Sequence, residues 1–171
     1  MPKIIEDLRK RLLEEAEKQI MAGGYTAMTI RSVARMCHVA VGTVYNYFPS
    51  KDELIATVML ERWKTCVRRI NSTAKAAQTP EEVLREIYVQ LSDYINDYQM
   101  LFRDEAAISA FAASDGKYHE ILRDQLATPL YRFCSTTFEG EFIAEAMLTW
   151  TVAGEGFEEI YQVIRKIIEK E

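Results

Sequence analysis

Glycine and proline are scarce in this sequence, with 7 and 4 copies among 171 residues. Both residues interrupt helices and build turns, so their scarcity argues against a fold made of many short strands. Strong helix formers are plentiful instead, and 49% of the residues are hydrophobic. We therefore predict an all-α chain that buries a sizeable core.

Long apolar runs are also missing. No stretch approaches the roughly 18 residues that a membrane span needs, and the charged N-terminus has no signal-peptide hydrophobic segment. Cys37, Cys66 and Cys134 are an odd number at wide spacing, which fits buried thiols in a reducing compartment better than disulfides or a zinc site. We expect a cytoplasmic protein that does not interact with a membrane.

Catalytic residue types do not gather in any recognisable pattern. His38 and His119 are the only histidines, and neither has a nucleophile, an acidic partner or metal-ligand spacing around it. This pattern argues against an enzyme and gives no reason to expect a cofactor or a metal. A small enzyme that uses polar residues of the C-terminal part is the alternative from another functional class.

The net charge of −5 is unevenly distributed along the chain. Residues 1–51 contain eight Lys or Arg and five Asp or Glu, a net charge of +3, whereas residues 52–171 contain thirteen and twenty-one, a net charge of −8. A basic first part on an acidic remainder is expected when the first part alone touches phosphates. Ordinary surface charge is the alternative explanation.

Apolar residues recur at helical steps of three and four through most of the chain. The first stripe, from Ile5 to Ile20, ends at Gly23–Gly24, where a glycine can adopt a positive φ. The pattern predicts further helices over residues 30–37, 40–48, 50–77, 79–98, 100–113, 117–138 with a kink near Pro129, and 141–169. Residues 1–49 would form a three-helix head, and residues 50–171 a helical body joined to it without a flexible linker.

The two short helices after the first long one make a helix-turn-helix. In the second of them, Val44 and Phe48 are apolar anchors, while the other positions are small or can form hydrogen bonds: Gly42, Thr43, Tyr45, Asn46 and Tyr47. A glycine inside so short a helix costs about 1 kcal/mol relative to alanine, which makes sense where the backbone approaches a DNA strand. This composition favours a recognition helix over a plain core helix.

Several of these side chains suit particular atoms of duplex DNA. Thr43 and Asn46 can reach base edges or phosphates, and a tyrosine hydroxyl such as that of Tyr45 can donate to a phosphate. Lys51, at the start of the next helix, would place its ammonium by a flanking phosphate, and Thr29 offers its hydroxyl and nearby amides to another. Packing of the tyrosines against neighbouring helices is the alternative.

The stretch from Thr29 to Leu54, TIRSVARMCHVAVGTVYNYFPSKDEL, resembles the helix-turn-helix signature of the TetR repressor family. The matching positions are Thr29, Ala34, Val39, Gly42, Thr43, Tyr45, Tyr47, Phe48, Ser50, Lys51, Glu53 and Leu54. The resemblance implies a homodimer on a palindromic double-stranded operator, which these residues would meet: Thr29, Gly42, Thr43, Tyr45, Asn46, Tyr47 and Lys51. It covers about the first third of the chain and implies a ligand-binding and dimerisation body beyond.

The turn departs from the family pattern, which has a glycine, an apolar residue, a capping serine and often a lysine. His38, Val39, Ala40 and Val41 stand at these positions. Ala40 cannot cap a helix, which costs about 1 kcal/mol, and His38 must adopt the turn without the freedom of glycine. Val41 could touch a thymine methyl group. We include it among the DNA-contact candidates, together with Arg31, which lies off the apolar stripe of its helix.

The last predicted helix is apolar over more of its circumference than one neighbour would cover. Its stripe includes Met147, Trp150, Gly154, Phe157, Tyr161 and Ile164, which we predict as a dimer seam. The resemblance implies the same, with two C-terminal helices per subunit forming a four-helix bundle. Packing within the monomer is the alternative, and Gly154 and Gly156 would either admit a close helix or kink this one.

The body contains more aromatic side chains than a minimal bundle of its length requires. Trp63, Tyr88, Tyr94, Tyr98, Phe102 and Phe111 are candidates for a ligand pocket, although core packing is their ordinary role. No cluster of Arg or Lys marks this region, so we expect an apolar or cationic effector. The leading hypothesis is a repressor that a small ligand releases from its operator. In the alternative, a DNA-binding protein without an inducer responds to a protein partner or to its own concentration.

Overall fold

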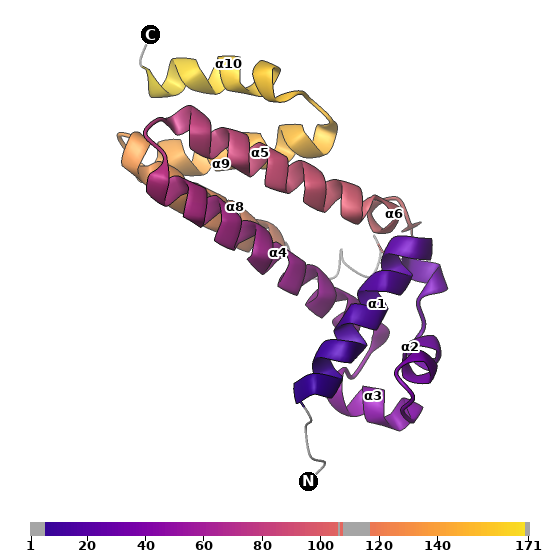
Figure 1. The fold of residues 1–171 in the computed structure, drawn as a ribbon. Coiled ribbons are helices and arrows are strands. Elements are labelled where there is room, and N and C mark those ends of the chain that lie inside the picture. Colours follow the sequence, from indigo (N-terminus) through magenta and orange to yellow (C-terminus); the bar gives the residue numbers. More distant parts are fainter. Residues whose placement is uncertain (1–5, 106, 108–116, 170–171) are drawn as a thin grey trace. The chain divides into compact units, whose positions relative to one another are not determined.

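The structure, a computed structural model, describes residues 6–105, 107 and 117–169. Every regular element in these ranges is helical, which confirms the predicted fold class: α1 Glu6–Ala27, α2 Ile30–Met36, α3 Val41–Tyr47, α4 Lys51–Ala76, α5 Pro80–Asp97, α6 Gln99–Phe102, α8 Lys117–Ala127, the 3-10 helix η1 Thr128–Phe133, α9 Thr137–Ala153 and α10 Phe157–Ile168 (Figure 1). None of the described helices is long and apolar enough to cross a membrane.

The chain forms two compact units whose boundaries fall inside α4 and α5. Unit 1 comprises the described residues of 1–63 and 97–113, and unit 2 those of 64–96 and 114–171. Each unit is therefore built from two separate stretches of sequence. The predicted division into residues 1–49 and 50–171 concerns function, and it stays a proposal.

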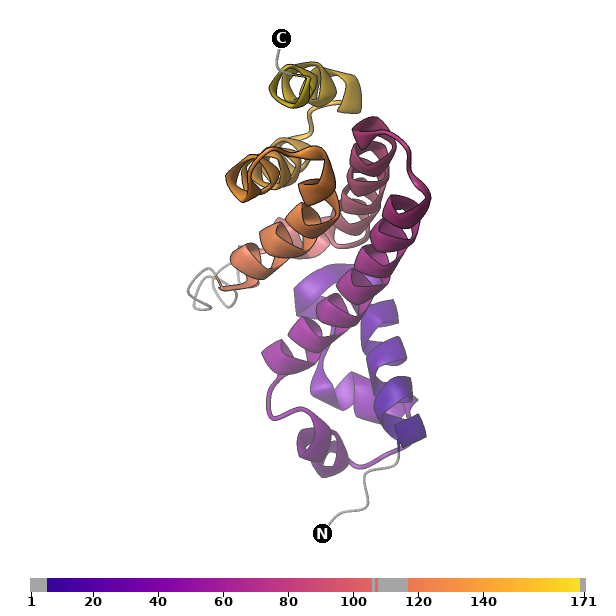
Figure 2. The same cartoon turned by 90° about the vertical axis from the view of Figure 1, so that its left-hand side faces the viewer.

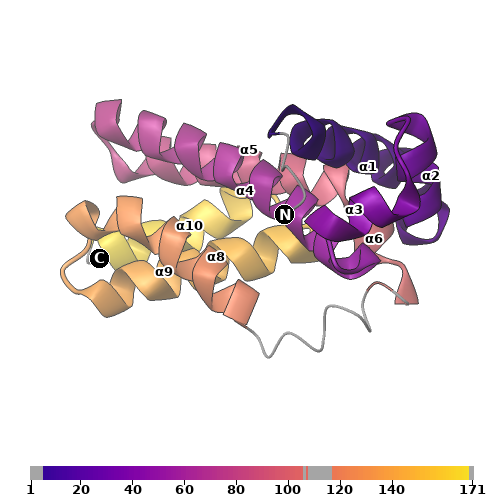
Figure 3. The ribbon, with the colours of Figure 1, turned by 90° about the horizontal axis from the view of Figure 1, so that it is seen from below.

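Unit 1 packs α1, α2, α3, the first half of α4 and α6 around one core. Its fully buried side chains include Leu12, Ile20, Val33, Val44 and Leu54. α1 leaves helical geometry at Gly24, which has φ 70°, so the predicted stop for the first helix is confirmed. A Cβ added at Gly24 would lie 3.3 Å from the Cβ of Met100, because α6 packs on the end of α1 (Figure 3).

Unit 2 joins the second half of α4 to α5, α8, η1, α9 and α10. Figure 2 shows α8 and α9 in orange beside the strongly amphipathic α5. The helix predicted over residues 117–138 is wrong beyond Ala127, where the chain tightens into η1 around Pro129. A new helix then starts, because Thr136 accepts the amide of Glu139 at 3.1 Å and Glu139 accepts the amide of Ser135 at 2.7 Å.

The prediction of one last helix from residue 141 to 169 is also wrong. α9 runs straight through Gly140, where a Cβ would meet the ring of Tyr131 at 2.6 Å, so this glycine permits close packing instead of ending a helix. The break falls at Gly154, which has φ 90° and donates to the carbonyl of Thr151 at 3.1 Å. α10 then begins after Gly156.

The helix predicted over residues 100–113 ends early. α6 stops at Phe102, and Asp104 Oδ1 accepts the amide of Ala107 at 3.1 Å. Most of the remaining predicted range lies outside the described residues.

Candidate nucleic-acid interface

α3 is held in unit 1 by two apolar side chains. Val44 is fully buried and Phe48, which follows the last turn, is 2% exposed, as the sequence predicted. The other side chains of the helix remain at its surface: Val41, Gly42, Tyr45 and Asn46 are exposed, and Thr43 and Tyr47 are half-buried. Tyr45 is 50% exposed, so core packing does not account for it.

Backbone hydrogen bonds close the turn between α2 and α3. The amide of His38 donates to the carbonyl of Arg35 at 3.2 Å, and the amide of Val39 donates to that of Ala34 at 3.0 Å. This pair is a Schellman motif, which places its C′ residue in the left-handed region, and His38 has φ 56°. Ala40 then enters α3 without a side-chain cap. The turn thus accommodates His38 through its backbone conformation, whereas α3 starts without the side-chain cap that Ala40 cannot supply.

Thr29 starts α2 through a reciprocal cap. Its Oγ1 accepts the amide of Ser32 at 3.0 Å, and Ser32 Oγ accepts the amide of Thr29 at 3.1 Å. Ser32 also donates to Gln19 Oε1 at 2.5 Å, which ties the start of α2 to α1. The Thr29 hydroxyl is therefore engaged in capping. Thr29 and Arg31 are both exposed, and their contact with DNA stays a prediction.

Lys51 begins α4 and lies against Tyr25. Its Nζ is 3.9 Å from the centre of the ring, and the Tyr25 hydroxyl donates to Asp52 Oδ1 at 2.6 Å. This hydrogen bond, together with burial and the nearby carboxylates, raises the pKa of Tyr25 to about 12. Burial lowers the pKa of Lys51 against the opposing pull of Asp52. The cation–π contact holds the ammonium in place beside the helix-turn-helix.

A distant stretch of sequence completes this part of unit 1. Thr26 donates to Asp104 Oδ2 at 3.2 Å, and the Tyr98 hydroxyl donates to Glu17 Oε1 at 3.2 Å. Both bonds join α1 to the segment around α6. This contact is not predictable from the sequence, because no local pattern pairs residues 78 positions apart.

The candidates for a ligand pocket are divided between the two units. Trp63, Tyr98 and Phe102 belong to unit 1, whereas Tyr88 and Tyr94 belong to unit 2, and Phe111 lies outside the described residues. Two of these hydroxyls form hydrogen bonds within the protein. Tyr98 donates to Glu17, as described above, and Tyr88 donates to the carbonyl of Glu155 at 3.2 Å. Phe102 is 45% exposed. That these residues line one pocket stays a prediction.

The predicted dimer seam divides into two sets. Met147, Phe157 and Ile164 are buried inside unit 2, which leaves them almost no surface for a partner. Phe157 stacks on Tyr161, with ring centroids 5.4 Å apart, because the break at Gly154 folds α10 back into its own unit. Trp150 and Gly154 are exposed and Tyr161 is half-buried. For the buried three, packing within the monomer, the alternative considered above, accounts for the apolar pattern.

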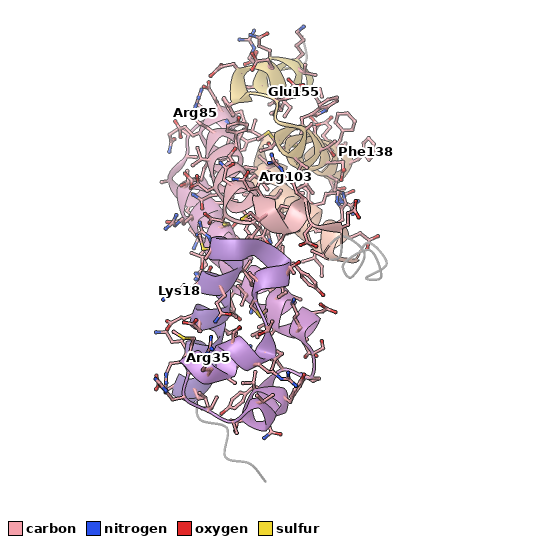
Figure 4. All side chains as sticks on the ribbon, turned by 90° about the vertical axis from the view of Figure 1, so that its right-hand side faces the viewer. Lys18, Arg35, Arg85, Arg103, Phe138 and Glu155 are labelled. Atoms are coloured by element: carbon pink, nitrogen blue, oxygen red, sulfur yellow. The ribbon has the colours of Figure 1, made fainter. Side chains whose placement is uncertain are left out.

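Exposed apolar side chains follow another face of α9, of which only Trp150 was among the predicted seam residues. Phe138, Phe142 and Trp150 are 70%, 51% and 52% exposed, and Figure 4 labels Phe138 near the edge of unit 2. Ala146 and Ala153 continue the line at helical spacing. We call these five residues the α9 stripe.

The comparisons with known proteins agree with this geometry. Residues 12–58 match the model of the bacterial regulatory proteins of the tetR family. The HTH-type transcriptional repressor KstR of Mycolicibacterium smegmatis is 33% identical over 107 residues, which cover 63% of this chain and 52% of that protein. The chain thus spans about half the length of the curated relatives it matches.

Solved structures extend the likeness in fold to nearly the whole chain. The Streptomyces coelicolor protein SCO7518 superposes with a TM-score of 0.69 at 15% identity, covering 95% of this chain and 98% of its own. SCO4454, a TetR-family transcriptional regulator from the same species, superposes with a TM-score of 0.58 at 16% identity, covering 96% and 94%. Residues 12–58 thus contain a helix-turn-helix that matches the tetR family of bacterial regulatory proteins, on a fold similar to that of a solved TetR-family regulator.

Proposed function

We propose that this protein is a transcriptional repressor that binds duplex DNA by placing α3 in the major groove. The observation that carries the proposal is the surface of α3, where Gly42, Tyr45 and Asn46 are exposed on a helix anchored from behind by Val44 and Phe48. A recognition helix needs this combination, because its outward side chains must reach base edges while the helix keeps its position.

The side chains divide by the DNA atoms that they suit. Thr43 and Asn46 would read base edges, with Val41 available to a thymine methyl group. Tyr45 and Lys51 would contact phosphates, which fix position without reading sequence. The basic balance of residues 1–51 supports this assignment, and so does the description of the KstR relative as a repressor. Regulation of this kind places the protein in the cytoplasm, where bacterial DNA is found.

A homodimer on a palindromic operator is part of the proposal. Two recognition helices must meet successive major grooves, about 34–36 Å apart. The α9 stripe brings three exposed aromatic side chains together on one helix, and exposed apolar patches mark interaction sites. A second copy of the chain is the occupant that a two-fold symmetric operator requires.

The test is the selection of bound sequences from a random duplex pool, followed by titrations with single variants. We expect a palindromic consensus. Lys51→Ala should weaken binding to it and lower the slope of log affinity against log salt by about one, because one phosphate contact is lost. Lys18→Ala, an equal loss of charge at an exposed site on α1 (Figure 4), is the control and should leave the slope unchanged. An unchanged slope for Lys51→Ala would overturn the phosphate assignment.

Release by a small ligand bound in the body is the proposed mode of control. The ligand must favour the conformation that does not bind DNA, and a preference of about 1–3 kcal/mol suffices for a measurable response. A protein partner or the protein's own concentration is the competing mode. A compound that stabilises the fold and lowers operator affinity favours the first, whereas stabilising compounds that never change operator affinity favour the second.

A further inference from the structure

The interior of unit 2 contains two polar side chains. Gln90 on α5 and Thr151 on α9 are 4% and 6% exposed, and they are the buried polar or charged residues among those that the structure describes. Gln90 Oε1 and Thr151 Oγ1 have no hydrogen-bond partner within the described ranges 6–105, 107 and 117–169. Buried polar atoms normally have partners, so two such atoms in one unit require an explanation.

Each of the two side chains stands at a position of its helix that otherwise carries a buried apolar residue. Val83, Ile87, Gln90 and Tyr94 follow one another along α5 at steps of four, three and four, and all are buried. The residues Gly140, Ala144, Met147 and Thr151 repeat this spacing along α9. Both polar side chains therefore point into the interior of the unit and not along its surface.

Contacts made by residues near the two positions join their helices. Tyr88, two residues before Gln90, donates to the carbonyl of Glu155, four residues after Thr151. The rings of Tyr88 and Phe157 meet edge-on with centroids 5.6 Å apart. Arg85, labelled with Glu155 in Figure 4, donates to Glu158 at 3.1 Å. The middle of α5 thus lies alongside the junction of α9 and α10.

We propose that Gln90 and Thr151 are the polar anchors of the effector site in unit 2. This inference rests on the proposed function and names the chemistry of the ligand. The effector is a neutral, largely apolar molecule with a hydroxyl or amide group. That group donates to Gln90 Oε1, and the Thr151 hydroxyl bonds to the same group or to a second polar atom of the ligand.

The neutral charge follows from the surroundings. The described side chains buried in unit 2 include no Asp, Glu, Lys or Arg. A charged ligand would therefore lose its hydration there and gain no group of opposite charge in return. An amide or hydroxyl needs only the hydrogen bonds that Gln90 and Thr151 offer, while the apolar part packs among side chains such as Ile87 and Leu148. The earlier expectation of an apolar or cationic effector narrows to a neutral one.

The first measurement is the melting temperature without any ligand. Gln90→Met and Thr151→Val keep nearly the same volume and remove the unpaired atoms, so each should raise Tm by about 2–4 °C. A fall in the Tm of both variants would show that the removed atoms had partners, such as a buried water or another part of the chain. That result would overturn the proposal.

The second measurement uses four small probes on the wild type: benzyl alcohol, benzamide, toluene and benzoate. At ten times its dissociation constant, benzyl alcohol or benzamide should raise Tm by about 3–6 °C. Toluene, which lacks the donor, should have less than half this effect at the same concentration, and benzoate none. Equal shifts for toluene and benzyl alcohol, or no shift for any probe, would overturn the proposal.

Variants then locate the binding. Gln90→Met and Thr151→Val should reduce the benzyl alcohol shift to that of toluene. Gln162→Met and Thr149→Val make the same chemical changes at exposed positions of α10 and α9 and should keep the wild-type shift. An undiminished shift in both interior variants would overturn the assignment. Operator binding by the ligand-free wild type tests the proposed function separately, since the probe shifts do not depend on it.

Discussion

Unit 1 presents several of the side chains proposed to contact DNA, such as Tyr45 and Asn46, at the exposed surface of the short helix α3. In unit 2, by contrast, the polar atoms of Gln90 and Thr151 that lack partners are buried. Unit 1 satisfies its internal polar groups through caps and turn hydrogen bonds, such as those of Thr29, Ser32 and His38. The two units therefore present their hydrogen-bonding groups in opposite ways.

This difference follows from what each unit is proposed to bind. DNA is a large charged surface, so its reader needs outward groups on a rigid frame. A small neutral effector gains affinity by leaving water, so its site needs a few polar atoms inside an apolar interior. In these proposals, the surface that reads DNA belongs to unit 1 and the interior that binds the effector belongs to unit 2.

The largest expected effect comes from comparing two neighbouring aromatic residues of unit 1, one that supports the fold and one at the surface. Phe48→Ala should lower the free energy of unfolding by about 3–5 kcal/mol, because it empties a buried site. Tyr45→Ala should change stability by less than about 1 kcal/mol, since the ring is half exposed, yet weaken operator binding. Urea unfolding and DNA titration of both variants measure this. Equal losses of stability would remove the distinction between frame and surface.

The next effect concerns the α9 stripe of unit 2. Trp150→Glu should weaken dimerisation about a hundredfold, equivalent to ~2.7 kcal/mol, because it places a charge in the proposed apolar seam. Val89→Glu, an exposed site on α5, is the control and should leave association unchanged. Sedimentation of both variants at micromolar concentration measures the effect. A wild-type monomer under these conditions would refute the dimer.

Substitutions at two glycines distinguish a conformational requirement of the backbone from a close approach of DNA. Gly154→Ala should destabilise the protein by about 1 kcal/mol, since its φ of 90° disfavours a side chain. Gly42→Ala should stabilise it by up to about 1 kcal/mol, because a Cβ there meets nothing within 4 Å. The same methyl group should weaken operator binding if DNA approaches Gly42. Tighter binding by Gly42→Ala would exclude that close approach.

The smallest expected effect is a change in stability at alkaline pH. Tyr25 has a pKa raised to about 12 in the folded state by its hydrogen bond to Asp52, compared with about 10 when unfolded. The stability that this group contributes is present below about pH 10 and is lost as the pH rises towards about 12. Tyr25→Phe should therefore show a shallower fall in Tm over this window. Parallel Tm curves for the two proteins would contradict the assignment.

The head was predictable from sequence because local signals define it. Val44 and Phe48 are buried as the pattern predicted, and the short-range caps of Thr29 and Ser50 start the helices that flank α3. The exposure of Tyr45 on α3 agrees with the role that the pattern favoured over packing. Helix caps and turns carry their own sequence signatures, which makes such a motif readable.

The body was less predictable because tertiary contacts decide its helix boundaries. Gly140 looked like a break, yet it packs against Tyr131 within α9. Gly154 ends α9 instead. Its sequence context is compatible both with the close approach of another helix and with a kink, and the sequence does not distinguish the two. Gln90 and Thr151 are polar residues within apolar stripes of the sequence. The ligand-pocket prediction was based on aromatic residues and did not include them. Sequence periodicity shows which side of a helix is buried, but not which polar atoms lack partners there.

The hydrogen bond from Thr26 to Asp104 also bears on how the chain folds. Unit 1 contains the described residues of 97–113, so its closing contacts form only after the intervening stretch of unit 2 has been synthesised. Closing so long a loop costs entropy that local helix formation does not repay. On the ribosome, the helix-turn-helix would therefore be synthesised early, but the contacts of α1 with the α6 segment would form only later. A fragment ending at Ala76 should form α2 and α3 yet fray at the end of α1.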